Sequence, residues 1–276
     1  MTDTLVLGAG AAGLMCAIAA ARRGRRVTVL ERSNKPGKKI LMSGGGRCNF
    51  TNLHVAPERY LSANPHFCKS ALARYTQWDF IEWVERSGIE YFEKETVNGL
   101  SGQLFCRGSS KQVVAMLLGE CQRLGVELRL NCETTAVDRD DGDFTVSTST
   151  GDLRTDSLVV ATGGLSIPSL GGSAFGYTLA EQFGLRLLPT APGLVPFTFT
   201  GAENALFARL SGVGCEVELA TDELHCGACG VVCGVNDLCE ASACTPATPP
   251  PSLPRSSTSS SCARRPRGGA RRRHPA

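Results

Sequence analysis

The most constraining feature of this 276-residue chain is a glycine motif between a short apolar run and an alanine-rich run near its start. Residues 8–13 read GAGAAG, which fits the pattern G-x-G-x-x-G. Residues 4–7 predict a buried parallel strand, residues 11–23 a helix, and residues 27–30 a second strand followed by Glu31. This order predicts a βαβ unit, and therefore an α/β protein whose first domain is Rossmann-like.

Each glycine of the motif has a separate task when a dinucleotide binds. Gly8 permits the tight turn, Gly10 lets a pyrophosphate approach the backbone, and Gly13 lets the helix pack close to the strand. The helix N-terminus, which includes Ala12, offers N–H groups and a partial positive charge. Glu31 can accept hydrogen bonds from a ribose diol and would repel a 2′-phosphate, so we expect an ADP moiety here. The alternative is a glycine-rich turn that binds nothing.

A second glycine-rich stretch follows this unit and reads KKILMSGGGRCNFTN over residues 38–52. Its consecutive glycines cost conformational entropy unless a ligand or another backbone comes close. Arg47, Asn49 and Asn52 add hydrogen-bond donors beside them. We expect a loop that runs along the pyrophosphate and reaches an isoalloxazine ring, although composition alone also allows a flexible surface loop.

A third motif ends a later strand. Residues 157–161 predict a buried strand that runs into Thr162, Gly163 and Gly164. Strands with the ending Ala-Thr-Gly-Gly recur in flavoproteins that bind two dinucleotides, where the chain passes back near the flavin. The order of the three motifs therefore favours an FAD site.

Patterning between and after these motifs predicts the remaining elements. Helices are expected in residues 65–88, in two pieces, in residues 112–124 and near residues 174–183. A strand is expected at residues 126–130, a hairpin across residues 144–155, and a β-rich region at residues 185–219.

The three motifs, together with residues 64–89, 102–114 and 165–185, closely resemble the BaiN/YhiN-like family of NAD(P)/FAD-dependent oxidoreductases, also called aminoacetone-oxidase-family FAD-binding enzymes. The similarity covers about residues 3–219, and SGGGRCNFTN is its most specific segment. The resemblance implies an FAD-binding domain of the glutathione-reductase type, interrupted by an inserted substrate-side domain, in a longer chain. It assigns no catalytic acid or base.

The motifs and the resemblance together predict a set of FAD-binding residues and no metal ligand. These residues are Gly8, Gly10, Ala12, Gly13, Glu31, Arg32, Ser43, Gly44, Gly45, Gly46, Arg47, Cys48, Asn49, Ala161, Thr162, Gly163 and Gly164.

The sequence departs from the family pattern after Leu219. The family's final glycine-rich segment, of the type GxxxDxxGxxGGYN, is not found, and a cysteine-rich stretch stands there instead. We expect residues 1–188 to be the first part of the FAD-binding domain, residues 189–220 to begin the β-rich inserted domain, and residues 221–276 to be an atypical tail. The tail is rich in Cys and then in Pro, Ser and Arg, and its last part, residues 245–276, is expected to be disordered.

The cysteines at positions 226, 229, 233, 239 and 244 allow three interpretations. A zinc site typically requires two pairs of ligands, and only Cys226 and Cys229 have the spacing of such a pair. A disulfide module would suit a secreted protein. A frameshift, fusion or misjoined gene would also explain the change in composition, and we favour this interpretation. Farther upstream, Cys48 and Cys106 are expected to be buried or loop thiols rather than a redox pair.

Charge and hydropathy limit the kinds of partner that the sequence predicts. Residues 1–220 hold 22 basic and 22 acidic side chains, so the net charge of +3 comes entirely from the tail. This balance predicts no nucleic-acid surface. The chain starts without a signal-peptide pattern and has no apolar run long enough for a membrane span, so a soluble cytoplasmic protein is expected.

The expected function is that of an oxidoreductase with non-covalently bound FAD. Hydride is expected to pass from NAD(P)H through the flavin to a small organic acceptor or to oxygen. Two alternatives stay open. The chain could be a truncated, non-catalytic flavoprotein remnant, or residues 226–244 could form a Cys-rich metal-binding module.

Overall fold

The computed structural model describes residues 2–96, 99–166, 172–190, 205 and 208–210, and a strand pair within residues 237–246. The chain divides into two compact units, Met1–Ala191 and Pro192–Ala276, each of which is described by itself. The predicted boundaries at residues 188 and 220 stay predictions. Among the described residues, no helix has the length and apolar character needed to cross a membrane.

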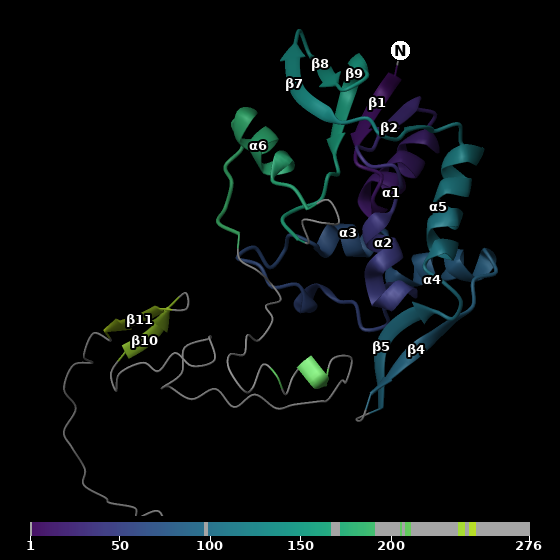
Figure 1. Ribbon diagram of the computed structural model, residues 1–276, viewed down its shortest axis with the longest axis vertical. Helices are drawn as coiled ribbons and strands as arrows, with labels where there is room; N and C mark the ends of the chain where they lie inside the picture. The colour runs from purple at the N-terminus through teal and green to yellow at the C-terminus, as the bar shows by residue number, and fades with distance from the viewer. Residues whose placement is uncertain are drawn as a thin grey trace, which may run out of the picture. The chain divides into compact units, whose positions relative to one another are not determined.

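The first unit is built on a six-stranded mixed sheet in the order β6-β2-β1-β9-β8-β7 (Figure 1). The first four strands in this order are parallel to one another, and β8 and β7 extend the sheet as antiparallel strands. This arrangement confirms the predicted Rossmann-like α/β fold. The strands are β1 (Thr2–Leu7), β2 (Val27–Leu30), β6 (Glu127–Arg129), β7 (Thr134–Asp140), β8 (Asp143–Thr148) and β9 (Gly151–Val160).

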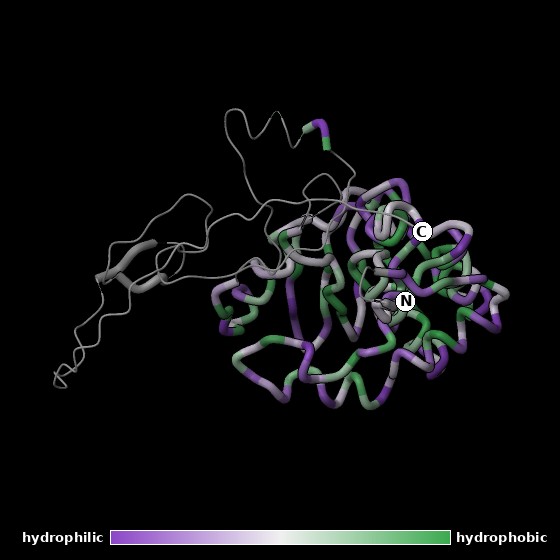
Figure 2. The backbone as a smooth tube through the Cα atoms, turned by 90° about the horizontal axis from the view of Figure 1, so that it is seen from below, coloured by the Kyte–Doolittle hydropathy of each residue, from purple (hydrophilic) through white to green (hydrophobic). Residues whose placement is uncertain are grey.

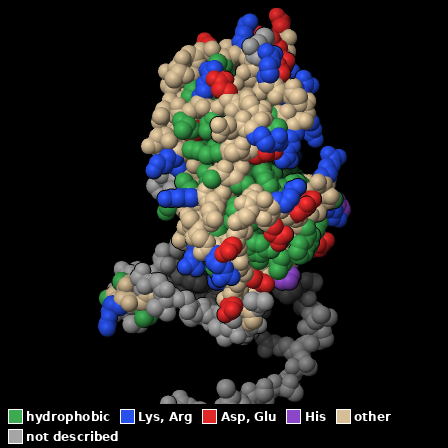
Figure 3. Space-filling model, turned by 90° about the vertical axis from the view of Figure 1, so that its right-hand side faces the viewer, with side chains coloured by type: hydrophobic (Ala, Val, Ile, Leu, Met, Phe, Trp, Pro, Cys, Tyr) green, Lys and Arg blue, Asp and Glu red, His purple; other side chains and the backbone are tan. Residues whose placement is uncertain are grey.

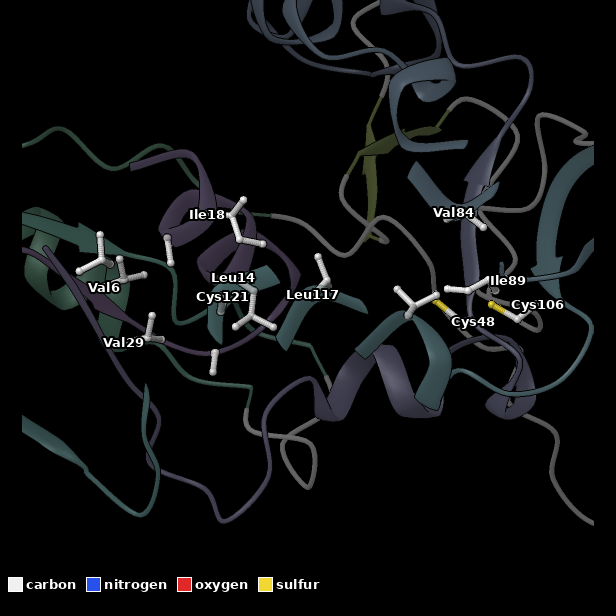
Figure 4. Close-up of a cluster of buried hydrophobic side chains, with 14 residues drawn as sticks. Val6, Leu14, Ile18, Val29, Cys48, Val84, Ile89, Cys106, Leu117 and Cys121 are labelled. Atoms are coloured by element: carbon white, nitrogen blue, oxygen red, sulfur yellow. The ribbon is translucent and has the colours of Figure 1, made fainter. Parts of the chain in front are cut away.

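The sheet is covered on both faces, which explains the uninterrupted apolar run in β1. Val6 belongs to a buried cluster with side chains of α1 (Ala11–Ala21) and α5 (Lys111–Arg123), several of which Figure 4 shows. Leu5 and Leu7 belong to a second cluster, which includes Leu179 of α6 (Phe175–Gln182). Hydrophobic and hydrophilic stretches accordingly alternate along the backbone of the folded part (Figure 2).

A smaller antiparallel sheet in the order β3-β5-β4 lies beyond α2 and η1 in the chain. Cys106 of β5 belongs to the cluster that contains Val6, as do the buried residues Cys48 and Ile89, which lie just before β3 and β4. A capping box between Thr76 and Asp79 begins the helix α4 that packs near it. The elements of this region are α2 (Lys38–Met42), η1 (Ser43–Gly46), β3 (Asn49–Asn52), η2 (Pro57–Arg59), α3 (Lys69–Arg74), α4 (Gln77–Arg86), β4 (Tyr91–Thr96) and β5 (Gly99–Cys106).

Several expectations differ from the structure. The segment 36–52, predicted as a loop, contains α2, η1 and β3, and the strands β4, β5 and β7 were not predicted. The two strands expected at residues 153–155 and 157–161 form one continuous strand, β9, and its last residue Val160 is 43% exposed rather than buried.

The β-rich region expected at residues 185–219 is not seen at residues 185–190, which form no strand, or at residues 205 and 208–209, which are helical. Its other residues lie outside the described part. In the second unit, the antiparallel strands β10 (Asp237–Glu240) and β11 (Ala243–Pro246) were not predicted, and their register pairs Cys239 with Cys244. The rest of the predicted disordered tail lies outside the described residues.

Candidate dinucleotide-binding site

The glycine motif forms the turn between β1 and α1. The Gly8 N–H donates to the Leu30 carbonyl at 2.7 Å, which holds the turn against the neighbouring strand β2. Gly10 is the N-cap of α1 and supplies no side-chain cap. The first N–H groups of a helix have no partner within the helix. They therefore point out of the start of α1 as donors for an anion.

The three glycines have different surroundings. A Cβ atom on Gly8 would lie 2.5 Å from the Ala161 carbonyl oxygen, and one on Gly13 would lie 1.9 Å from the Gly8 carbonyl oxygen. A Cβ atom on Gly10 would meet no described atom within 4 Å. Gly8 and Gly13 are thus required by the packing of the backbone, whereas the space at Gly10 opens into a cavity.

Glu31 follows β2 and is fixed by backbone donors. Its Oε2 accepts from the Ala9 N–H and its Oε1 accepts from the Ser33 N–H, each at 2.9 Å. Each carboxylate oxygen has a further lone pair. The side chain is therefore held beside the glycine motif and can still accept hydroxyl groups of a ribose.

The Ala-Thr-Gly-Gly turn lies directly beside the glycine motif. The Ala161 N–H donates to the Leu7 carbonyl at 2.8 Å, which extends the pairing of β9 with β1. The hydroxyl of Thr162 is buried and has no hydrogen-bond partner within the described part of the chain. Gly163 has φ 78°, a conformation that favours glycine.

A cavity of about 490 Å³ joins these elements. Such a volume is typical of small-molecule sites. Eight of the predicted FAD-binding residues line it: Gly8, Gly10, Ala12, Glu31, Arg32, Ala161, Thr162 and Gly163. Gly13 lies behind the turn against Gly8, and Gly164 follows the lining residues. The predicted contacts of all these residues with FAD stay predictions.

The cavity also contains residues outside the predicted set of FAD-binding residues, although Lys38 and Lys39 begin the stretch that was expected to run along the pyrophosphate. They fall into a basic group on and before α2, a group after β6, and a group before and in α6. These residues are Lys35, Lys38 and Lys39, then Cys132, Glu133 and Thr134, and then Ser173 and Phe175. The signal for the second group was partial, because a strand was predicted at residues 126–130 but its place beside β2 in the sheet was not.

Ser43 to Asn49, predicted to reach the flavin, are not among the lining residues of this cavity. Gly44, Gly45, Gly46 and Cys48 all have φ between 54° and 85°. A Cβ atom on Gly44 would lie 2.6 Å from the Phe105 ring, and the Gly46 carbonyl accepts from the Ser110 N–H at 2.8 Å. The segment is thus a turn held by contacts at Gly44 and Gly46, whereas a Cβ atom on Gly45 would meet nothing within 4 Å.

The other polar side chains of this turn also contact protein. Ser43 Oγ donates to the Ile40 carbonyl at 3.0 Å, and the Arg47 guanidinium lies 5.7 Å from the centre of the Phe92 ring. With its amide oriented for hydrogen bonding, Asn49 donates to the carbonyls of Thr51 and Leu104. The role of these residues at the flavin stays a prediction.

Cys48 and Cys106 are distant in sequence but adjacent in the fold (Figure 4). Both are buried free thiols, as expected from the sequence. Burial raises the pKa of the Cys48 thiol, and burial together with Cys48 raises the pKa of Cys106 to about 11. Both therefore stay protonated at neutral pH, which disfavours a nucleophilic role.

No group of three or more His, Cys, Asp or Glu residues that could hold a metal is present among the described residues. Most of residues 226–244, for which a metal-binding module was considered, lie outside the described residues. On the face of the molecule shown in Figure 3, Lys and Arg side chains are spread rather than gathered into one patch.

The shape of the cavity fits FAD. Gly10 leaves open space where the N-terminus of α1 meets the cavity, as a pyrophosphate requires. The Ala161–Gly163 turn lines the same cavity beside the glycine motif, so that backbone atoms of two strand ends surround the space.

Comparison with known proteins shows which family the chain matches. The chain matches the family described as HI0933-like protein Rossmann domain over residues 2–242. It is 55% identical over 196 residues to a protein named ribosomal RNA dihydrouridine synthase from Escherichia coli (strain K12), covering 71% of this chain and 48% of that protein. A Haemophilus influenzae protein of the same name is 48% identical over 222 residues, which cover 79% of this chain and 54% of that protein.

A more distant relative has a different name. The 3-dehydro-bile acid delta(4,6)-reductase of Clostridium scindens is 29% identical over 218 residues, which cover 78% of this chain and 51% of that protein. The chain spans about half the length of these curated relatives. The match over residues 2–242 shows that the chain belongs to the HI0933-like family of FAD-dependent Rossmann proteins.

Proposed function

We propose that this chain binds FAD in the cavity between β1, β2 and β9. It would act as the FAD-binding part of an oxidoreductase that passes hydride to an organic acceptor. The observation that carries this proposal is the open space at Gly10, where the N-terminus of α1, Glu31 and the Ala161–Gly163 turn converge on one cavity. The family match supports the same cofactor.

Different residues of the cavity would bind different parts of FAD. Glu31, fixed by two backbone donors, would accept the hydroxyls of the adenosine ribose. The N–H groups at the start of α1 would bind the diphosphate. Bound FAD would supply the capacity to take up and release a hydride.

The acceptor is inferred from the names of the relatives. One name describes the formation of dihydrouridine in ribosomal RNA, and the other a reductase acting at the delta(4,6) position of a 3-dehydro-bile acid. Both correspond to a two-electron reduction of a ring carbon–carbon double bond conjugated with a carbonyl. We therefore propose an acceptor with this group. The predictions of an NAD(P)H donor, of oxygen as an alternative acceptor, and of a small-molecule rather than a nucleic-acid partner stay predictions.

Anaerobic spectroscopy tests the proposal. The purified protein, supplied with FAD, should show a bound-flavin absorption band that NADH or NADPH bleaches. A cyclic enone, a uridine-containing RNA or oxygen should then be compared for its ability to restore the band. A protein that binds no FAD on titration would contradict the proposal, and restoration by oxygen alone would contradict the proposed acceptor.

A further inference from the structure

Lys39 connects two walls of the cavity. Its backbone lies on α2, while its Nζ lies 3.1 Å from where a Cβ atom would be on Gly163. Gly163 follows β9 and has φ 78°. Because glycine carries no side chain, the ammonium group can lie directly over the backbone of the Ala161–Gly163 turn.

The position of α2 is fixed by its N-cap residue, Gly37. The Gly37 N–H donates to the Ala9 carbonyl at 2.8 Å, within the glycine motif itself. A Cβ atom on Gly37 would lie 2.9 Å from a methyl group of Val114, so this residue also packs closely against α5. The start of α2 is thus anchored next to the N-terminus of α1, and Lys39 reaches into the cavity from a fixed base.

The charges in the cavity favour an anion. The described lining residues include the bases Arg32, Lys35, Lys38 and Lys39 and the acids Glu31 and Glu133. Glu31 is already bonded to two backbone N–H groups. Lys39 forms no ion pair with another described residue. An ammonium group without a described counterion, in a cavity that the N-terminus of α1 also lines, provides a charge-assisted contact for a phosphate.

We propose that Lys39 binds the diphosphate of FAD and is the side-chain cation of a phosphate site otherwise formed by backbone donors. This inference rests on the proposed function, because it assumes that FAD occupies the cavity. It assigns to α2 a role in binding the cofactor, in addition to its role in connecting the βαβ unit to the turn at residues 43–46.

Titration of the flavin-free protein tests the role of Lys39. FAD, ADP and adenosine are compared as ligands for the parent protein, Lys39→Met and Lys39→Arg. Lys39→Met should weaken FAD and ADP binding about 10- to 100-fold, as expected for loss of a charge-assisted hydrogen bond, and should leave adenosine binding unchanged. Lys39→Arg should retain most of the affinity because it keeps the positive charge.

Lys69→Met is the matched control, because Lys69 is an exposed lysine on α3 outside the cavity. It should bind FAD like the parent protein. If the parent protein binds FAD and Lys39→Met binds it equally well, or if adenosine binding falls as much as ADP binding, the role of Lys39 is overturned. If the parent protein binds neither FAD nor ADP, the proposed function itself fails.

Discussion

The glycines at positions 8, 10 and 13 belong to one motif but meet different constraints. Gly8 and Gly13 face backbone atoms that leave no room for a side chain. Gly10 faces open space and has φ −83°, which any residue can adopt. The motif therefore combines two positions that shape the turn with one position that leaves space for a ligand.

The same substitution at two of these glycines should separate folding from binding. Gly10→Ala should cost less than about 1 kcal/mol of unfolding free energy, because it only alters a helix N-cap. It should weaken FAD binding because the methyl group enters the cavity. Gly13→Ala should cost about 1–3 kcal/mol or more, because its Cβ overlaps the Gly8 carbonyl. Urea unfolding without FAD and titration with FAD measure both effects; an unchanged FAD affinity in Gly10→Ala would contradict the site.

The sequence predicts the residues that a local motif places and misses those that long-range pairing places. The positions of Gly8, Gly10 and Glu31 in the cavity follow from one βαβ unit. Cys132 reaches the cavity because β6 pairs with β2, and its N–H donates to the Glu31 carbonyl at 3.0 Å. Nothing in the local sequence around Cys132 indicates this pairing.

At the scale of elements, the helices of the first cluster are joined by charge as well as by apolar packing. Glu120 of α5 pairs with Arg22, the C-cap of α1, at 2.7 Å and with Arg123 at 2.8 Å. These contacts, first with Arg123 and then with Arg22, hold the pKa of Glu120 at about 2, below its ordinary value of 4.5. A carboxyl group with a lowered pKa stabilises the fold above pH 4.5 and loses this effect as the pH falls toward 2.

Glu120→Gln should therefore destabilise the protein at neutral pH and have little effect near pH 2. Because the arginine side chains are 53% and 64% exposed, solvent screening limits the loss to about 0.5–1 kcal/mol. Glu82→Gln is the control, since its pair with Arg86 is longer, at 3.8 Å, and both side chains are well exposed. Urea unfolding at the two pH values measures the difference. An equal loss for both variants would show that Glu120 does not link the helices.

Elements with strong periodicity or clear end signals were predictable, whereas those that depend on tertiary contacts were not. Residues 77–86 and 111–123 are amphipathic and form helices close to their predicted bounds. The helix α2 begins with two lysines, which are unfavourable at a helix N-terminus, and its start is fixed instead by the hydrogen bond from Gly37 to Ala9. The strand β7 carries many exposed polar residues and is identified only by its pairing with β8.

At the scale of the whole molecule, a ligand that binds only the folded chain should raise its stability. FAD at about 100 times its dissociation constant would contribute about 2.7 kcal/mol. For a protein of this size, that corresponds to a rise in Tm of about 5–10 °C. Thermal unfolding should show this rise with FAD and a smaller rise with ADP, which fills only the half of the site formed by the βαβ unit. A rise with riboflavin equal to that with FAD would contradict the expected binding of the ADP moiety.

The central position of β1 has a consequence for the synthesis of the protein. Thr4 pairs with Ser157, so β1 leaves the ribosome well before its partner β9, which is made more than 150 residues later. Until β9 is complete, one edge of β1 and the apolar side chains of Leu5 and Leu7 lack their final neighbours. Loop closure over this distance is slow compared with the formation of the local βαβ unit. A nascent chain of this fold therefore depends on its own early helices, or on chaperones, to keep its first strand from pairing with other chains during translation.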